Sequence, residues 1–227
     1  MSKILFVVTG ATYWTLNDGT RHPTGFWAEE LLTPYKTFTQ AGHEVVFATP
    51  GGVVPVADAG SLAPEVNGGR DVAPELDGIA GLASPLKLEE VDLADYAAVF
   101  YPGGHGPMED LTVDATSGRL LVEALESGKP LGVVCHAPAA LLAANRADGT
   151  SAFAGRKITA FSNEEERLGG LADKAIWLLE DRLNAIGADV QVAAPWTPNV
   201  VIDGNLVTGQ NPMASGPLAA ELLKHLG

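Results

Sequence analysis

The chain has 227 residues, 46% hydrophobic and 19% charged, which is enough apolar content for a large core and too little charge for an intrinsically disordered chain. Its formal net charge of -14 repels phosphate backbones, so we expect no nucleic-acid partner. One cysteine cannot form an intramolecular disulfide, the first apolar run is too short for a signal peptide, and no apolar stretch reaches the about 18 residues that span a bilayer. These features predict a cytoplasmic protein with no membrane partner.

Strands and helices alternate along the first half of the chain. The β-rich run Lys3–Gly10 predicts a buried strand, and the stretch from about Gly25 to Ala41 predicts an amphipathic helix that Pro34 kinks or breaks. A strand over His43–Ala48 follows. Residues 51–90 are rich in Gly, Pro and Asp, which predicts a long irregular excursion or flap of a kind that is often functional.

The second half continues the alternation. A short strand enters the glycine-rich turn Pro102–Gly106, a helix follows near Asp114–Ser127, and the strand Leu131–Val134 leads through Cys135 into an alanine-rich helix. The later predicted elements are a strand over Lys157–Phe161, a helix over Ala172–Gly187, three short strands within 189–209 with a turn at Asp203–Gly204, and a final helix with Ser215 as its cap and Pro217 in its first turn. This order predicts one α/β domain over residues 1–227, with a mostly parallel sheet flanked by helices on both faces.

Cys135 lies where a buried strand is expected to become a helix. In an open α/β sheet, ligands bind at the carboxyl ends of the strands, and a sharp strand-to-helix turn lifts a side chain out of the core. Helix amides at that position would favour the thiolate, which is the nucleophilic form. A lone cysteine is also commonly a small buried hydrophobe, so position alone leaves both interpretations open.

Two features near Cys135 add to the nucleophile hypothesis. His136 follows directly, although a neighbour in sequence rarely points the same way, so its ring need not touch the sulfur. The glycines of Pro102–Gly106 also follow a strand, and they permit a close approach of backbone amides to a developing oxyanion.

Helical spacing separates Glu29 from Glu30. The apolar stripe of the first predicted helix comprises Trp27, Leu31, Pro34, Tyr35 and Phe38. At about 100° per residue, Glu29 lies roughly opposite the centre of this stripe and is expected to face solvent. Glu30 lies about 75° from the centre, at the edge of the buried face, where a carboxylate needs a partner or a role. The acidic run Asn163–Gly170 reads as a solvated helix start, and charge alone does not choose among Glu164, Glu165 and Glu166.

Taken together, these residues resemble the ThiJ/PfpI superfamily over nearly the whole chain. The resemblance rests on "FYPGGHG", "GVVCHAPAAL", "PTGFWAEELLTPY" and "VIDGNLVTGQNPMAS". It implies a flavodoxin-like fold similar to class I glutamine amidotransferases. The "TGFWAEE" segment, the 51–90 excursion and "LVTGQNP" narrow it to the branch that contains heat-shock-type chaperones and glutathione-independent glyoxalases.

The resemblance also implies roles for individual residues. Cys135 matches the nucleophile, His136 the histidine beside it, and Glu30 the glutamate that contacts the sulfur. Glu166 matches the acid paired with the histidine, and the backbone amides of Gly104 and His136 match the oxyanion site. The chain lacks a late His-x-Glu pair, since its other histidines are His22, His43, His105 and His225, so ammonia release from glutamine is not expected. Some chaperone members of the superfamily have a metal site, and its position cannot be located in this sequence.

By resemblance, the expected activity is conversion of methylglyoxal to D-lactate without glutathione or any other cofactor. The thiolate would attack the aldehyde, and His136 or Glu30 would move a proton between the adjacent carbons. The alternatives are a holdase chaperone that binds unfolded proteins through an exposed patch around Trp14, Phe26, Trp27 and residues 51–90, a protein deglycase, and a cysteine peptidase or amidase. The resemblance also implies a homodimer.

Overall fold

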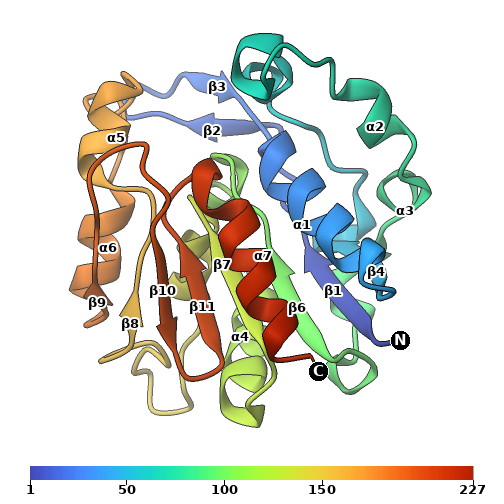
Figure 1. Cartoon of the computed structure of the whole chain (residues 1–227). Helices are drawn as coiled ribbons and strands as arrows, with labels where there is room; N and C mark the ends of the chain where they lie inside the picture. The colour runs from blue at the N-terminus through green and yellow to red at the C-terminus, as the bar shows by residue number, and fades with distance from the viewer. Residues whose placement is uncertain (227) are drawn as a thin grey trace.

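A central sheet of seven strands organises the protein (Figure 1). The computed structural model describes residues 1–226. Along the sheet the order is β10-β11-β7-β6-β1-β4-β5. These strands are β1 (Lys3–Val7), β4 (Glu44–Thr49), β5 (Leu86–Lys87), β6 (Ala98–Tyr101), β7 (Leu131–Val134), β10 (Val200–Asp203) and β11 (Leu206–Gly209). All neighbouring pairs are parallel except β10 and β11, which form an antiparallel hairpin. The predicted mostly parallel α/β sheet is confirmed.

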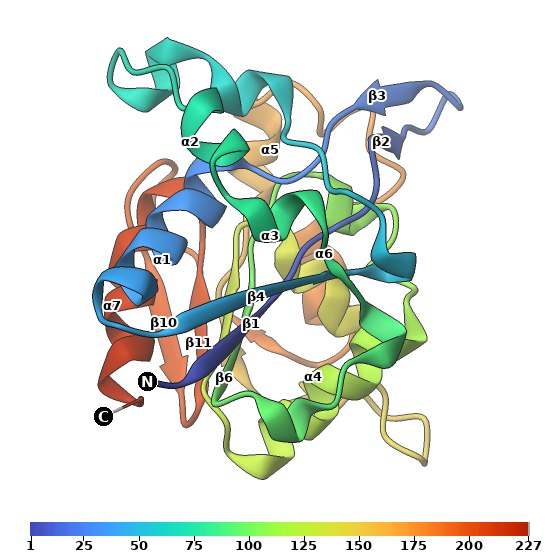
Figure 2. The same cartoon turned by 90° about the vertical axis from the view of Figure 1, so that its right-hand side faces the viewer.

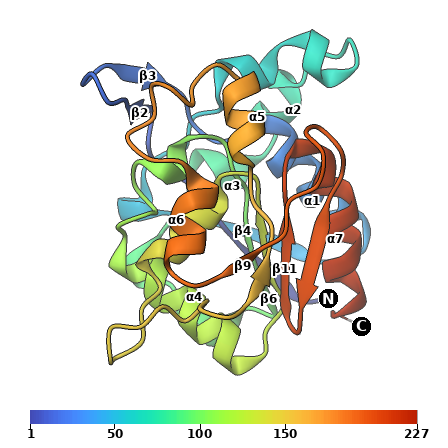
Figure 3. The same ribbon diagram turned by 90° about the vertical axis from the view of Figure 1, so that its left-hand side faces the viewer.

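Helices cover both faces of this sheet (Figures 2 and 3). One face carries α1 (Ala28–Gln40) and α7 (Ser215–Lys224), which also pack against each other. The other carries α4 (Ala115–Ser127), α6 (Leu179–Ala185) and the 3-10 helix Ala137–Ala143. Strands β6, β7 and β11 are therefore buried along their whole length, which explains why β6 and β7 read as continuous apolar runs without polar alternation.

Smaller elements lie over the carboxyl edge of the sheet, at the top of Figure 1. They are the hairpin of β2 (Tyr13–Thr15) and β3 (Arg21–Pro23), the helix α5 (Asn163–Leu168), and α2 (Ala73–Asp77) from the predicted excursion. The rest of residues 51–90 forms α3 (Ala80–Ala83), β5 and several 3-10 turns, so the excursion is ordered into short elements. Separately, β8 (Lys157–Ile158) pairs in parallel with β9 (Asp189–Val190). Within residues 1–226, no helix is long and apolar enough to cross a membrane.

Several predicted boundaries are wrong, and a local hydrogen bond explains the first of them. The strand expected over Lys157–Phe161 ends at Ile158, because the N–H of Thr159 donates to the Thr208 hydroxyl instead of to a neighbouring strand. Ser215 is the first residue of α7, and the cap position belongs to Ala214.

The helices depart from expectation in three further places. The helix expected over Ala172–Gly187 begins only at Leu179. The predicted break at Pro34 is absent, since α1 continues to Gln40. The segment after Cys135 is a 3-10 helix that ends at Ala143.

Gly104 allows the turn after β6 to lie against the start of α1. Its φ is +91°, and the N–H of Trp27 donates to the Gly103 carbonyl at 3.0 Å. A Cβ on Gly104 would lie 2.4 Å from the Gly25 carbonyl oxygen and 2.7 Å from the Trp27 nitrogen. Only glycine fits this close backbone approach.

We expect Gly104→Ala to lower the free energy of unfolding by roughly 2 kcal/mol or more beyond the effect of Gly149→Ala, as measured by urea denaturation. Gly149 also has a positive φ, +82°, but no heavy atom lies within 4 Å of its would-be Cβ. Both substitutions therefore place an alanine in a strained left-handed conformation, and only Gly104→Ala adds a clash with neighbouring backbone atoms. Equal losses in the two variants would contradict the tight packing.

Candidate active site

Cys135 lies directly after β7 in a strained backbone conformation. Its φ is +58°, a left-handed value that is rare for a residue with a side chain. Backbone hydrogen bonds fix it on both sides, since its N–H donates to Gly209 and its carbonyl accepts from Phe161, each at 2.9 Å. This turn directs the side chain to the carboxyl edge of the sheet, where it is 4% exposed.

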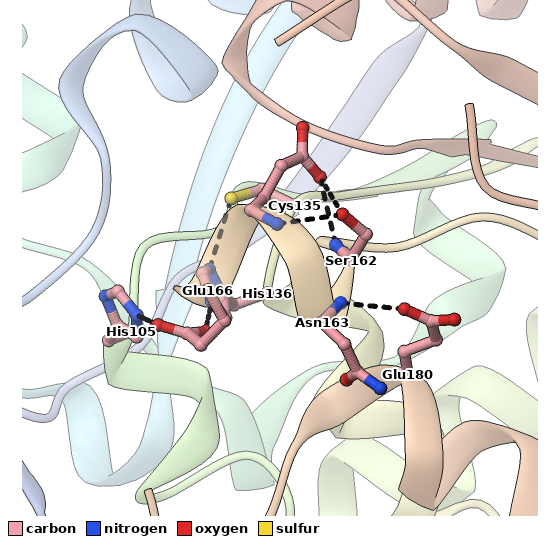
Figure 4. Close-up of polar contacts among 8 residues, drawn as sticks. His105, Cys135, His136, Ser162, Asn163, Glu166 and Glu180 are labelled. Atoms are coloured by element: carbon pink, nitrogen blue, oxygen red, sulfur yellow. Dashed lines mark hydrogen bonds and ion pairs between the residues drawn. The ribbon is translucent and has the colours of Figure 1, made fainter. Parts of the chain in front are cut away.

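His136 connects the sulfur to a carboxylate (Figure 4). Its Nδ1 lies 3.2 Å from the Cys135 sulfur, and its Nε2 lies 2.7 Å from Oε2 of Glu166. The sequence-based expectation that adjacent side chains point apart is wrong here, because the left-handed turn at Cys135 brings both onto one side. Of the three glutamates in the acidic run, Glu166 is the one paired with His136. Its other oxygen, Oε1, lies 3.0 Å from Nε2 of His105.

The protonation of this chain of groups follows from burial and charge. Burial, reinforced by the nearby His105, lowers the pKa of His136 to about 4. Burial alone would raise the pKa of Glu166, but its hydrogen bonds and attraction to the two histidines hold it below the usual range. We therefore assign an ionised Glu166 and a neutral His136, which donates its Nε2–H to Glu166 and presents the Nδ1 lone pair to the thiol.

Glu30, from α1, also interacts with the Cys135 thiol and has no exposed surface. Its Oε2 accepts a hydrogen bond of 2.8 Å from the backbone N–H of Gly103. Its Oε1 is buried without a hydrogen-bond partner among the described residues. Burial raises the pKa of Glu30 to about 8, although the contacts with Cys135 and Gly103 oppose this. At neutral pH the carboxyl is protonated and can donate to the sulfur.

The resting form of Cys135 differs from the sequence-based expectation. Burial and the neighbouring Glu30 raise the pKa of the thiol well above its usual value, and the backbone N–H of Gly104 only partly opposes them. The predicted stabilisation by a helix is weak, because the segment that follows is a seven-residue 3-10 helix. Cys135 therefore rests as a thiol, and to act as a nucleophile it would have to pass its proton to a base such as His136.

The side chains open onto a cavity of about 290 Å³. Cys135, His136, Glu166, His105 and Gly104 line its polar end. The remaining lining residues are mostly apolar or aromatic: His22, Trp27, Asp58, Phe161, Gly169, Leu171, Trp196 and Pro212. This volume is near the lower end of the about 300–1,000 Å³ typical of small-molecule pockets.

One group of side chains could hold a metal ion. The ligand atoms of His105, His136 and Glu166 lie within 4.8 Å of one another. Two histidines and one carboxylate form a donor set suited to a divalent transition metal. A metal there would replace the two hydrogen bonds to Glu166, so it would compete with the role of His136 as a base.

The sequence analysis assigned no role to His105 and did not recognise Glu165 as a buried capping residue. His105 lies within the glycine-rich turn and stacks on Trp14, with ring centroids 4.9 Å apart, which the pattern "PGGHG" did not reveal. Glu165 is fully buried and forms a capping box with Ser162. The spacing Ser-x-x-Glu is typical of a capping box at a helix N-terminus and could have predicted this role.

Two expectations about acidic residues are wrong. Glu165 and Glu166 are buried, so the acidic run is not a solvated helix start. Glu29 is half-buried rather than solvent-facing, and burial raises its pKa. Arg70, from the 51–90 excursion, lies near Glu29 and opposes that shift, so this excursion covers the face that the helix pattern assigned to solvent.

Comparison with known proteins identifies the family. The model of the DJ-1/PfpI family matches residues 23–225. The chain belongs to the DJ-1/PfpI family. It is 28% identical over 225 residues to the protein/nucleic acid deglycase HchA of Staphylococcus aureus, covering 95% of this chain and 77% of that protein.

Solved structures of family relatives superimpose over nearly the whole chain. The Rapid Encystment Protein of 24 kDa from Francisella tularensis has a TM-score of 0.87 and 28% identity, covering 100% of both chains. Glyoxalase III from Candida albicans has a TM-score of 0.84 and 25% identity, covering 99% of this chain and 97% of that one. These likenesses support the superfamily resemblance that the sequence motifs indicated.

Glu165 connects α5 to the segments that close the cavity. Its carboxylate accepts hydrogen bonds from five donors: the N–H and hydroxyl of Ser162, the side-chain amides of Gln210 and Asn211, and the N–H of Trp196. A glutamine in its place would turn an NH₂ group toward some of these donors and leave buried groups unpaired.

We expect Glu165→Gln to lower the free energy of unfolding by about 2 kcal/mol or more in urea denaturation. The adjacent Glu164→Gln is the matched control, because Glu164 is exposed and the same change there should cost less than about 0.5 kcal/mol. Similar stabilities of the two variants would show that the network around Glu165 contributes little.

Proposed function

We propose that the protein is a glutathione-independent glyoxalase that converts methylglyoxal to D-lactate. The observation that carries this proposal is the contact of the Cys135 thiol with both a neutral base, His136, and a protonated acid, Glu30, in the lining of a small cavity. A 2-oxoaldehyde needs a nucleophile to form a hemithioacetal and then a proton transfer between adjacent carbons. The name of the Candida albicans relative, glyoxalase III, supports the same activity.

The first step forms the carbon–sulfur bond. His136 Nδ1 accepts the thiol proton as the sulfur attacks the aldehyde carbon, C1, and the carbonyl electron pair moves to oxygen. The Gly104 N–H faces the sulfur and lies where it can stabilise that oxyanion. A second donor, the N–H of His136, stays a prediction. Return of the proton from His136 to the oxygen completes the hemithioacetal and leaves the histidine neutral again.

The next steps isomerise and release the product. Neutral His136 removes the proton from C1 while Glu30 gives its proton to the C2 oxygen, which yields an enediol. His136 then protonates C2 as the C1 hydroxyl returns a proton to Glu30, and a lactoyl thioester remains. Water hydrolyses the thioester to lactate and the free thiol. We therefore infer that His136 is the base, because burial keeps Glu30 protonated at neutral pH.

Deglycation is the second candidate function, favoured by the name of the Staphylococcus aureus relative. The same cysteine could accept the dicarbonyl fragment from a reversibly glycated amine. Lactate release from a freshly glycated peptide, measured with a trap that removes free methylglyoxal, separates the two activities. Lactate formed despite the trap supports deglycation, and its loss supports the glyoxalase.

The three aromatic residues expected to form the exposed patch of a holdase do not form one. Trp14 and Phe26 are each only 2% exposed, and Trp27 lines the cavity. The exposed large apolar side chains of the excursion are Val53, Val54, Val56, Val66 and Leu86. The homodimer and the binding of unfolded clients remain predictions.

Purified protein should produce D-lactate from methylglyoxal without glutathione, as followed by an enzymatic lactate assay. Cys135→Ala should abolish the reaction, and Glu30→Gln should reduce turnover roughly 100-fold or more, the usual scale for a lost general acid–base group. Glu29→Gln is the matched control, because Glu29 is not among the described residues that line the cavity. This change should alter turnover less than about threefold. Equal activity of the two glutamine variants would defeat the role of Glu30.

The dependence of kcat/KM on pH should be bell-shaped. Below a pH of about 4, His136 is protonated and cannot accept the thiol proton, so the rate falls. Above a pH of about 8, Glu30 ionises, repels the forming thiolate and has no proton to donate, so the rate falls again. Glu30→Gln should lose the alkaline limb, because an amide does not titrate. If the fall in rate at alkaline pH persists unchanged in Glu30→Gln, it is caused by the titration of another group.

A further inference from the structure

The cavity is more apolar than the substrate of the proposed reaction requires. Methylglyoxal offers only one methyl group beyond its two carbonyls. The cavity is nevertheless also lined by Trp27, Phe161, Leu171, Trp196 and Pro212. An apolar pocket stabilises a bound ligand by removing apolar surface from water. A small polar aldehyde has little apolar surface, so this lining would contribute little to its binding.

Charge restricts the ligand further. In the described part of the chain, the cavity lining includes no lysine or arginine, while two acidic residues, Asp58 and Glu166, contribute to it. An aldehyde that carries a carboxylate or phosphate would meet these acids without a cationic partner. The site therefore suits an uncharged substituent.

Trp196 is held over the cavity by its backbone. Its φ is +59°, and Cys135 is the only other non-glycine residue with a positive φ among residues 1–226. The Trp196 N–H donates to Oε1 of buried Glu165 at 3.0 Å, and Asn211 bonds both that oxygen and the Thr197 carbonyl. A residue kept in a strained conformation by a buried network marks a position that the fold imposes.

The indole of Trp196 remains available to a ligand. It is 46% exposed and meets Phe161 edge-on, with ring centroids 5.6 Å apart and planes at 67°. Phe161 in turn lies against the ring of His136, with centroids 4.3 Å apart. Aromatic surface thus continues from the proposed base to the outer wall formed by Trp196.

We propose that Trp196 and Phe161 form a binding wall for a planar apolar substituent, so that the preferred substrates are uncharged 2-oxoaldehydes with an aromatic group. This rests on the proposed glyoxalase function, and phenylglyoxal is the representative probe. Its aldehyde carbon reacts at Cys135 while its phenyl ring contacts the wall. The reaction is otherwise the same, and its product is mandelate in place of lactate.

The test compares kcat/KM for phenylglyoxal and methylglyoxal in wild type and in two Trp196 variants. Trp196→Gly removes the indole but keeps the N–H that bonds Glu165, and glycine accepts the positive φ, so folding should be preserved. Trp196→Phe keeps an aromatic ring. Trp177→Ala is the control for loss of a tryptophan elsewhere, since Trp177 packs against Arg182.

The ratio of kcat/KM for phenylglyoxal to kcat/KM for methylglyoxal should be roughly tenfold lower in Trp196→Gly than in wild type. A tenfold change is the scale expected for a lost aromatic contact together with its buried area. The ratio should change little in Trp196→Phe or Trp177→Ala. The intrinsic reactivities of the two aldehydes cancel in this comparison between variants. An unchanged ratio in Trp196→Gly, with both aldehydes still turned over, would overturn the inference and leave the glyoxalase proposal standing.

Binding of acetophenone, an unreactive ketone with the same ring, tests the wall without catalysis. Calorimetry should show binding to wild type that is at least about fivefold weaker in Trp196→Gly, with acetone as the control ligand. If neither aldehyde is turned over but this difference appears, the glyoxalase proposal fails and the aromatic wall is upheld. Equal acetophenone binding in the two proteins would overturn the wall independently of any activity.

Discussion

The positive φ of Cys135 is the constraint on which the site depends. It turns the chain sharply at the end of β7, so that the thiol and the neighbouring imidazole lie on the same side. Backbone bonds to Gly209 and Phe161 hold this conformation, which costs about 1–3 kcal/mol in isolation. The parallel sheet provides the rigid frame, because β11 and the segment after β8 contribute those two partners.

Three buried glutamates near this turn have three different states or roles. Glu30 has one backbone donor and otherwise little polar surrounding, so burial keeps it protonated. Glu166 receives hydrogen bonds from two histidines and is ionised. Glu165 touches neither the sulfur nor His136 but joins α5 to Gln210, Asn211 and Trp196. The number and kind of donors around each carboxyl determine what it can do.

The same arrangement explains how a cysteine with a raised pKa can serve as a nucleophile. A free thiolate beside Glu30 would place two anions in a poorly solvated space. A thiol that hands its proton to His136 only as the carbon–sulfur bond forms avoids that repulsion. Glu166 keeps the histidine in the tautomer that can accept this proton.

The sequence by itself determined the architecture and much of the machinery, because these features are local. Alternating apolar runs predicted the parallel sheet, the strand end placed Cys135 at its carboxyl edge, and helical spacing assigned Glu30 to the buried side of α1. Only the tertiary structure decided the partner of His136, the neutral state of the thiol, and the positions of His105 and Trp196 around the cavity. Those properties depend on burial and on charges brought together from distant segments, which no short stretch of sequence contains.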